Sequence, residues 1–412
     1  MGIRARKRVF LNICLLYVTF FSISAVMGNS AEKDGVKFKV QTDKPYTIVE
    51  RSNFARYDDG KYLGHVYREV RASINPSGKD GAGAALYRGN FIVMEETLRN
   101  MMQSARAVNA IIPVNFALSA EGRMRVEDDR GFPALRNFPV YGADSVTEGE
   151  NWTADGERAI DPLNEGKTFL VPFTAVYEYK GIEDYKGIPV HRIEASYKSN
   201  ADISALTPQA SGAFSGSGGA VLNKVSGKHD VTILIAVENE IMLLSRDNLD
   251  ETFSWNDGKN VRFKGFTLCF TQDIVPLDGR KIKKEVESTD GVELEPVDSG
   301  LRLSIRDLQF VSDSDQLLPS EAARIDIIAA SLSGIEDRTF LVEGHTAATG
   351  RPDAEMRLSI ERAKRIVDEL SARGIPLGRF IYKGWGGTKP LGNNSSEEGR
   401  KLNRRVEITI LD

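Results

Sequence analysis

The sequence predicts an α+β protein: a mostly antiparallel β region, built as a curved sheet or a sandwich, followed by a smaller C-terminal α/β domain. Between residues 32 and 280, short segments with alternating apolar side chains recur, which is typical of strands with one buried face. After residue 300, apolar segments alternate with two amphipathic runs at helical spacing. Residues 278–300 are rich in charge and poor in large apolar side chains, so we divide the chain there into a β region (29–282) and a C-terminal domain (283–412).

The N-terminus is predicted to be a secretory signal peptide spanning residues 1–28. Basic residues between positions 4 and 8 precede a largely apolar run over 9–26, and cleavage is expected near Gly28 or Ala31. A retained membrane anchor is the alternative, because the run approaches the ~20 residues that a span needs, but its polar side chains favour cleavage. We therefore expect an exported protein in the periplasm, and association with the outer membrane is compatible with this.

The cysteines are Cys14 and Cys269. Cys14 lies within the apolar run rather than after it, which argues against a lipoprotein signal. If the signal peptide is removed, only Cys269 remains, so no internal disulfide is expected. Its apolar surroundings indicate a strand, and hence a buried, unreactive thiol.

The composition excludes some classes of protein. The 412 residues carry a net charge of -4, which leaves no cationic footprint for nucleic acid, so we expect no nucleic-acid partner. Charged residues at 27% and hydrophobic residues at 41% are ordinary for a globular chain.

The β region contains one clear hairpin. Alternating apolar side chains at 173–179 and 191–197 flank a run of turn residues at 181–187. Residues 231–237 are apolar on both faces and aromatic residues make up only 8% of the chain, which favours a soluble periplasmic domain over a membrane barrel with aromatic girdles. A division into two subdomains near 144–162 stays open.

The search for catalytic chemistry finds little. The histidines are scattered, and none has a second ligand at metal spacing. The Gly-rich segment 211–220 lacks the lysine of a phosphate loop and the Gly-X-Ser-X-Gly of a nucleophile elbow. We interpret Asp247, Asp250 and Glu251 as solvated loop carboxylates, and Trp152 as an aromatic side chain that covers the core. We therefore predict no enzymatic activity, no cofactor and no metal.

The C-terminal domain is predicted in more detail. A strand at 340–343 ends in a Gly-His-Thr turn and is followed by an amphipathic helix over 354–373. Apolar segments at 380–382 and 406–410 predict further strands. With a second helix over 320–333, the pattern indicates a βαβαβ-type sandwich in which helices cover one face of a sheet.

Four motifs follow one another here: Gly344-His345-Thr346 with Gly350; Leu358-Ser359 with Arg362-Ala363; Gly384 with Gly386; and Asn394, Gly399-Arg400 and Asn403-Arg404-Arg405-Val406-Glu407. In this order they resemble the OmpA-like peptidoglycan-binding domain family. The resemblance covers only the C-terminal part of the chain and leaves the β region unexplained. It implies a non-catalytic domain that binds the stem peptide of peptidoglycan.

The resemblance also implies a ligand site. In the family, an aspartate after Gly-His-Thr and the arginine of Leu-Ser-X-X-Arg-Ala hold diaminopimelate, whose ammonium and carboxylate need an anion and a cation close together. Here the arginine is Arg362, but the aspartate position is Ala347. The other ligand-binding residues that the resemblance implies are Thr346, Gly350, Asn394 and Arg404.

Ala347 predicts weakened binding. Losing one charge-assisted hydrogen bond costs about 2 kcal/mol, which is roughly a tenfold loss of affinity or more. Asp353 and Glu355, near the start of the helix, are candidates to replace the carboxylate, although Asp353 is better explained as the helix N-cap. The alternative for Arg362 is a surface side chain paired with Glu355 or Asp368.

Two hypotheses of different classes follow. In the first, the protein associates with peptidoglycan through its C-terminal domain, while the β region contacts other envelope proteins or lipids. In the second, the domain has lost peptidoglycan binding, and the chain is an envelope scaffold or a protein- or lipid-interaction module. A third idea, that the β region encloses an apolar ligand, requires a large interior cavity.

Overall fold

The computed structural model describes residues 35–411 except 43, 99–105, 143, 163–167, 204–205, 207–220, 274–278, 287–288, 298, 312–313 and 336–337. The predicted signal peptide at 1–28 and the Gly-rich segment at 211–220 lie outside the described residues. A thirteen-stranded sheet and a six-stranded sheet organise the described fold. Within this part of the chain, no helix has the length and apolar character needed to cross a membrane.

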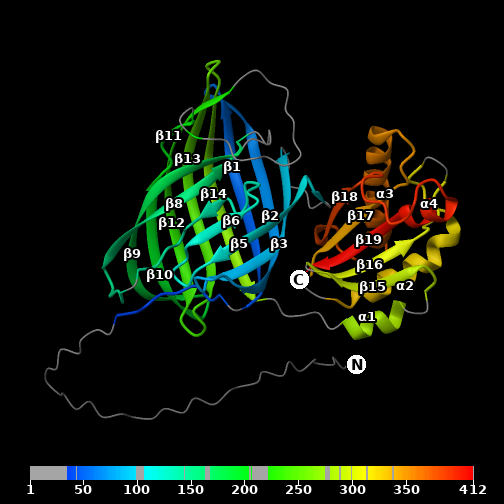
Figure 1. Cartoon of the computed structure of the whole chain (residues 1–412), viewed down its shortest axis with the longest axis horizontal. Helices are drawn as coiled ribbons and strands as arrows, with labels where there is room; N and C mark the ends of the chain where they lie inside the picture. Colours follow the sequence, from blue (N-terminus) through cyan, green and yellow to red (C-terminus); the bar gives the residue numbers. More distant parts are fainter. Residues whose placement is uncertain are drawn as a thin grey trace, which may run out of the picture. The chain divides into compact units, whose positions relative to one another are not determined.

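The thirteen-stranded sheet is antiparallel and curls round on itself into a nearly closed, barrel-like shape (Figure 1). Its strands are β1 (Tyr46–Asp58), β2 (Lys61–Lys79), β3 (Ala85–Leu98), β5 (Ala110–Leu118), β6 (Met124–Glu127), β7 (Leu135–Arg136), β8 (Asn151–Ile160), β9 (Phe169–Tyr185), β10 (Ile188–Lys198), β11 (Ala201–Asp202), β12 (Leu222–Ala236), β13 (Met242–Trp255) and β14 (Asn260–Asp273). They are arranged in the order β6-β5-β3-β2-β1-β14-β13-β12-β10-β9-β8-β7, with β11 beside β12. The predicted curved, mostly β region is confirmed.

Alternation of side chains gives the sheet its apolar interior. In β9, Phe173, Ala175 and Tyr177 are buried, while Thr174 and Val176 between them are exposed. Successive side chains of a strand point to opposite faces, so this period of two turns one apolar row inward along the strand. The buried rows of neighbouring strands pack together as the core of the β region.

The predicted hairpin is formed by β9 and β10, which pair antiparallel. Its turn is Lys186-Gly187, where both residues have positive φ, rather than the whole run from 181 to 187. Gly181 lies inside β9, close to an irregularity in the pairing with β10. Strands before and after residues 144–162 belong to the same sheet.

The six-stranded sheet is mixed and has the order β15-β16-β19-β17-β18-β4. Its strands are β4 (Arg106–Ala107), β15 (Val292–Val297), β16 (Gly300–Arg306), β17 (Phe340–Gly344), β18 (Phe380–Gly384) and β19 (Arg405–Leu411). The helical segments are α1 (Gly279–Val286), η2 (Pro319–Glu321), α2 (Ala322–Ser333), α3 (Pro352–Ala372), η3 (Leu377–Arg379) and α4 (Glu397–Asn403). The parallel strands β17 and β18 are connected through α3, which makes a βαβ unit.

Helices α2 and α3 pack on the same core, as the sequence predicts. They contribute fully or nearly fully buried residues at helical spacing: Ile325, Ile328, Ala329 and Leu332 from α2, and Ala363, Ile366, Val367 and Leu370 from α3. The sheet contributes Phe340, Val342, Phe380, Val406 and Ile408 to this core. The charged stretch at 278–300 contains α1 and β15, and β15 forms the opening hairpin with β16.

Candidate functional site

The loop after β17 carries the first motif and is fixed by backbone contacts. At Gly344, a Cβ would lie 2.1 Å from the carbonyl oxygen of Ser359, so a side chain cannot be accommodated without a shift of the helix backbone. The His345 N–H donates to the Arg405 carbonyl at 3.0 Å, and the Thr346 N–H donates to the Gly386 carbonyl at 2.9 Å. The Gly-His-Thr motif therefore joins the end of β17 to β19 and to the segment after β18.

Asparagines of the last motif connect that loop to the segment before α4. The fully buried Asn403 accepts hydrogen bonds through Oδ1 from the N–H groups of Leu391 and Gly392, at 2.7 and 2.8 Å. Its Nδ2 donates to Oδ1 of Asn394 at 2.8 Å, and the Ala348 N–H donates to the same oxygen at 3.0 Å. The structure thus brings Asn394 beside the loop, with its amide oxygen already engaged.

Glu355 stabilises the loop from the first turn of α3. Its Oε1 accepts hydrogen bonds from the N–H and hydroxyl of Thr349 and from the Arg351 N–H. Burial favours the neutral acid, but these donors outweigh burial and lower the pKa of Glu355. The N-cap position of α3 is Arg351, which makes no side-chain capping hydrogen bond, so the interpretation of Asp353 as the N-cap is wrong.

The arginines expected at the ligand site have neighbours within the domain. Nε of Arg362 donates to the Ser314 carbonyl at 3.1 Å, and its guanidinium lies 4.6 Å from the centroid of the Phe310 ring. Arg404 forms an ion pair with Glu397 at 2.7 Å. Both guanidinium groups are therefore oriented by the fold itself.

The remaining expected residues define an uncharged turn. Ala347 and Thr346 are both buried, and the Thr346 hydroxyl has no hydrogen-bond partner among the described residues. Gly350 is exposed with a φ of +84°, and no heavy atom lies within 4 Å of the place where its Cβ would be. The surface turn at Gly350 therefore leaves room for a ligand to approach the backbone, but position 347 brings no charge.

His345 is buried beside Glu407. Its Nε2 lies 3.6 Å from Oε2 of Glu407, which is too long for a hydrogen bond. Burial, together with the nearby Arg405, lowers the pKa of His345. Burial opposes ionisation of Glu407, but His345 and Arg405 outweigh it and bring the pKa of this carboxyl to about 2. The loop is thus built around a neutral imidazole and a charged carboxylate.

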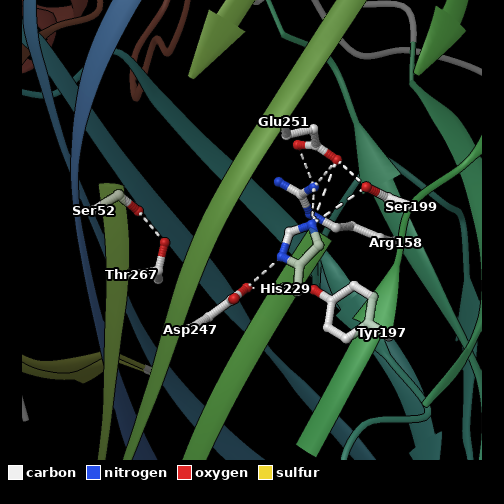
Figure 2. A network of polar contacts seen from close by, with 8 residues as sticks. All are labelled: Ser52, Arg158, Tyr197, Ser199, His229, Asp247, Glu251 and Thr267. Atoms are coloured by element: carbon white, nitrogen blue, oxygen red, sulfur yellow. Dashed lines mark hydrogen bonds and ion pairs between the residues drawn. The ribbon is translucent and has the colours of Figure 1, made fainter. Parts of the chain in front are cut away.

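A second cluster of polar groups lies inside the curved sheet of the β region (Figure 2). Nη1 of Arg158 donates to both carboxylate oxygens of Glu251, and the Ser199 hydroxyl donates to Oε1 at 2.6 Å. Glu251 is 1% exposed, and burial alone would raise its pKa. The charge of Arg158 and the hydrogen bonds outweigh burial and bring the pKa of Glu251 to about 2.

His229 connects this ion pair to a second carboxylate. Its Nδ1 lies 2.8 Å from Oδ2 of Asp247, and the Tyr197 ring stacks on the imidazole with centroids 4.2 Å apart. Burial disfavours the imidazolium, but hydrogen bonds to Asp247 and Glu251 outweigh burial and raise the pKa of His229. The imidazole is thus placed between two carboxylates, the buried Glu251 and the partly buried Asp247.

The interpretation of Asp247 and Glu251 as solvated loop carboxylates is wrong. Both lie on β13 and belong to the inward-facing row that also contains the buried Leu249. Only Asp250 faces outward, where it pairs with Arg262 at 2.6 Å. The apolar residues at every second position of β13 are the signal that would have placed Asp247 and Glu251 on the buried face.

Ser199, His229 and Asp247 lie next to one another in space like the serine, histidine and aspartate of a catalytic triad. The Ser199 oxygen lies 3.3 Å from Nε2 of His229, whose Nδ1 faces Asp247. A nucleophilic serine needs its proton directed at the histidine and its oxygen open to substrate. Here the hydroxyl donates to Glu251, and Ser199 has 0% exposure. The cluster therefore lacks the geometry of a nucleophile. Among the described residues, no group of three or more His, Cys, Asp and Glu side chains could hold a metal ion.

The C-terminal elements define a small α/β sandwich whose motif residues lie at the ends of β17 and β18 and in the loops that follow them, on α3 and α4, and at the start of β19. Residues 309–404 match the OmpA family, and the C-terminal domain belongs to that family.

Similar domains occur in a peptidoglycan-binding protein and in a probable lipoprotein. The chain is 33% identical over 103 residues to the peptidoglycan-binding protein ArfA of Mycobacterium tuberculosis. The aligned segment covers 25% of this chain and 32% of ArfA. It is also 37% identical over 101 residues to the probable lipoprotein YiaD of Escherichia coli. That aligned segment covers 24% of this chain and 46% of YiaD. The chain thus spans less than half the length of these curated relatives.

Similar domains are also found among solved structures. The cell wall anchor of the T6SS from Pseudomonas aeruginosa is 32% identical in sequence and aligns over 33% of this chain and 97% of its own, with a TM-score of 0.29.

Proposed function

We propose that this protein is a non-catalytic component of the cell envelope that associates with peptidoglycan through its C-terminal domain. The observation that carries the proposal is the loop with the Gly-His-Thr motif. Hydrogen bonds connect this loop to β19 and to Asn394, and it lies between β17 and the α3 helix that bears Arg362. The names of the relatives support it, since ArfA is called a peptidoglycan-binding protein and YiaD a probable lipoprotein.

The chemistry of the site favours a ligand that carries a carboxylate. The guanidinium of Arg362 offers a planar set of donors that suits a carboxylate, and diaminopimelate ends in one. The backbone of the 346–350 loop, together with Asn394 and Arg404, would complete the site. Because Ala347 supplies no carboxylate for the ligand ammonium, the affinity is expected to be weakened.

The absence of catalysis is part of the proposal. Among the residues that the structure describes, Ser199, His229 and Asp247 resemble a catalytic arrangement, but the Ser199 hydroxyl is buried and bonded to Glu251. We place the protein in the periplasm, exported by residues 1–28, where the β region would contact other envelope proteins or lipids.

A calorimetric titration of the full chain with soluble muropeptides tests this function. A muropeptide with diaminopimelate in its stem should bind, while one with lysine at the same place should bind at least tenfold more weakly, because lysine lacks the carboxylate that Arg362 takes. Equal affinity for the two muropeptides would contradict the role of Arg362. Absence of binding to either would favour the second function below.

The second candidate function is an envelope scaffold whose OmpA domain has lost peptidoglycan binding. The buried, uncharged Ala347 favours this alternative, because the ligand ammonium would be desolvated there without a counter-charge. In that case the interactions of the protein reside in the β region.

A further inference from the structure

The interior of the β region contains a cavity of about 330 Å³. This volume lies within the range of pockets that hold small ligands, about 300–1,000 Å³. The cavity reaches from Lys39 and Lys44 at one end of the sheet to Arg158 and Leu249 farther inside. The nearly closed sheet therefore has interior space that the core side chains do not fill.

The cavity has two unlike walls. One wall is aromatic and is formed by Phe91, Phe116, Phe132, Phe138 and Tyr141. The other is polar and runs across adjacent strands, where the residues are paired in register: Glu50 with Cys269 and Ser245, and Arg68 with Ser52, Thr267 and Asp247. Figure 2 shows part of the second row, in which the hydroxyls of Ser52 and Thr267 are 2.9 Å apart. The cavity therefore matches a molecule with one polar end and an apolar body.

Within the part of the chain that the structure describes, some charged side chains on the polar wall have an ion-pair partner of opposite charge, and Arg68 does not. Arg158 is paired with Glu251, and His229 with Asp247. Arg68 makes no hydrogen bond to another described residue, its Nε is buried and unpaired, and its guanidinium faces the Phe132 ring at 5.6 Å. Two carboxylates lie near Arg68. Glu95 is its cross-strand neighbour on β3 and lines a second, smaller pocket with it. Glu50 is an electrostatic neighbour of Arg68, but burial raises the pKa of Glu50 and so disfavours the anion there.

An arginine side chain does not lose its proton in proteins, so Arg68 keeps its positive charge at every ordinary pH. The side chain is partly buried, and its Nε is buried without a hydrogen-bond acceptor among the described residues. A buried donor without an acceptor is costly, so a ligand anion that supplies one is favoured. From Ser52, level with Arg68, to Tyr46 near the mouth, β1 rises by about 20 Å, which leaves room for an extended hydrocarbon chain.

We propose that this cavity binds a single-chain amphiphile with one carboxylate, of the fatty-acid class, whose carboxylate pairs with Arg68 while its hydrocarbon chain lies along the aromatic wall toward Tyr46. This inference concerns the β region alone and does not depend on peptidoglycan binding by the C-terminal domain. It assigns the lipid contact expected of the β region to this cavity, and it identifies the lipid head group as a carboxylate that pairs with Arg68.

The test is calorimetric titration of the full chain with laurate, below the concentration at which laurate forms micelles. Dodecanol and dodecylamine, which have the same chain length, are the comparison ligands. Laurate should saturate one site and bind at least tenfold more tightly than dodecanol. No saturable binding of laurate, or binding of dodecylamine as tight as that of laurate, would overturn the proposal.

Variants locate the head group. Arg68→Met should abolish the preference for laurate over dodecanol, and Arg68→Lys, which keeps the charge, should retain part of it. Lys264→Met removes a cation from an exposed position on β14 and should leave the preference unchanged. If Lys44→Met at the mouth abolishes the preference and Arg68→Met does not, the assignment of the head group to Arg68 is wrong. Circular dichroism melts show whether each variant is folded. If a variant does not fold, the comparison of laurate with dodecanol and dodecylamine on the wild-type chain still tests the proposal.

Discussion

The two regions of the molecule each bury a histidine next to carboxylates, and they do so with opposite electrostatic outcomes. In the β region, His229 is hydrogen-bonded to Asp247, and its pKa is raised. In the C-terminal domain, His345 lies too far from Glu407 for a hydrogen bond, and its pKa is lowered. The comparison teaches that burial alone does not decide the charge of a histidine, because direct hydrogen bonds to anions can outweigh the loss of solvent.

The two regions also differ in the interactions that hold their polar residues in place. The β region places one ion pair in the interior of the sheet, between strands that are far apart in the sequence, namely Arg158 and Glu251. The C-terminal domain instead fixes its motif-bearing loops through close backbone packing at Gly344, the end of β17, and through the uncharged side-chain amide of Asn403, the end of α4. The interior network stabilises a fold with a cavity, whereas the loops present a surface to a ligand.

The largest effect is expected from breaking the interior ion pair. Arg158→Met leaves the charge of Glu251 buried without its main partner and should destabilise the β region by about 3–5 kcal/mol. Hydrogen exchange followed by mass spectrometry measures this as lost protection in peptides of β12 and β13. Arg192→Met, on the outward face of β10, removes a solvent-exposed pair and should cost about 1 kcal/mol or less.

Peptides of α3 in the C-terminal domain are the internal control for that experiment. Their protection should be unchanged in Arg158→Met, because the two cores consist of different residues. Unchanged protection of β12 and β13 in the same variant would show that the interior pair does not stabilise the sheet.

The next effect is a gain of function in the C-terminal domain. Ala347→Asp restores the anion that the family places after Gly-His-Thr and should increase affinity for a diaminopimelate muropeptide by about 2 kcal/mol, or roughly tenfold or more. Titration calorimetry measures the change, and Ala348→Asp, on the next and exposed residue, is the matched control. Equal gains in the two variants would indicate a general charge effect instead of a specific contact.

A smaller effect is expected at the helix that precedes β19. The Ser396 hydroxyl caps α4 by accepting a hydrogen bond from the Gly399 N–H at 3.0 Å. Ser396→Ala should destabilise this segment by about 1 kcal/mol, while Ser396→Asp, which keeps a capping oxygen, should preserve it. Hydrogen exchange of peptides from α4 distinguishes the two; a loss of protection as large in Ser396→Asp as in Ser396→Ala would contradict the capping role.

The smallest effects are the pH dependences of the two histidines. The pKa of His229 is raised above 6.5, so its contribution to stability is fully present below pH 6.5 and is lost as the pH rises through the pKa of the folded state. The pKa of His345 is lowered below 6.5, so its contribution is present above pH 6.5 and is lost as the pH falls through its folded pKa. An NMR titration of the imidazole protons should show His345 titrating at lower pH than His229, and the reverse order would contradict the comparison.

The sequence predicts the C-terminal domain well because its determinants are local and chemically restrictive. Gly344 is required by the approach of the Ser359 carbonyl, and Asn403 is required by the hydrogen bonds of a turn only eleven and twelve residues earlier. Such requirements fix residue types at fixed spacing. They are therefore visible as motifs in a single chain.

The interior of the β region could not be predicted in the same way. The strands and their curvature follow from alternation, but the partners Arg158 and Glu251 are 93 residues apart, and Ser52 and Thr267 are 215 apart. Their contacts depend on the register of strands that no local pattern specifies. The local sequence consequently predicts a loop for Asp247 and Glu251, and the cavity with Arg68 at its polar wall exists only in the folded sheet.

The most direct test of the central claim is co-sedimentation of the full chain with purified peptidoglycan, with Arg362→Ala beside Arg357→Ala. Arg357 is on the same helix but is largely exposed, so its replacement controls for the loss of one positive charge from α3. The wild-type chain and Arg357→Ala should sediment with the wall, and Arg362→Ala should stay in the supernatant. Sedimentation of Arg362→Ala to the wild-type extent, or of none of the three, would contradict the central claim.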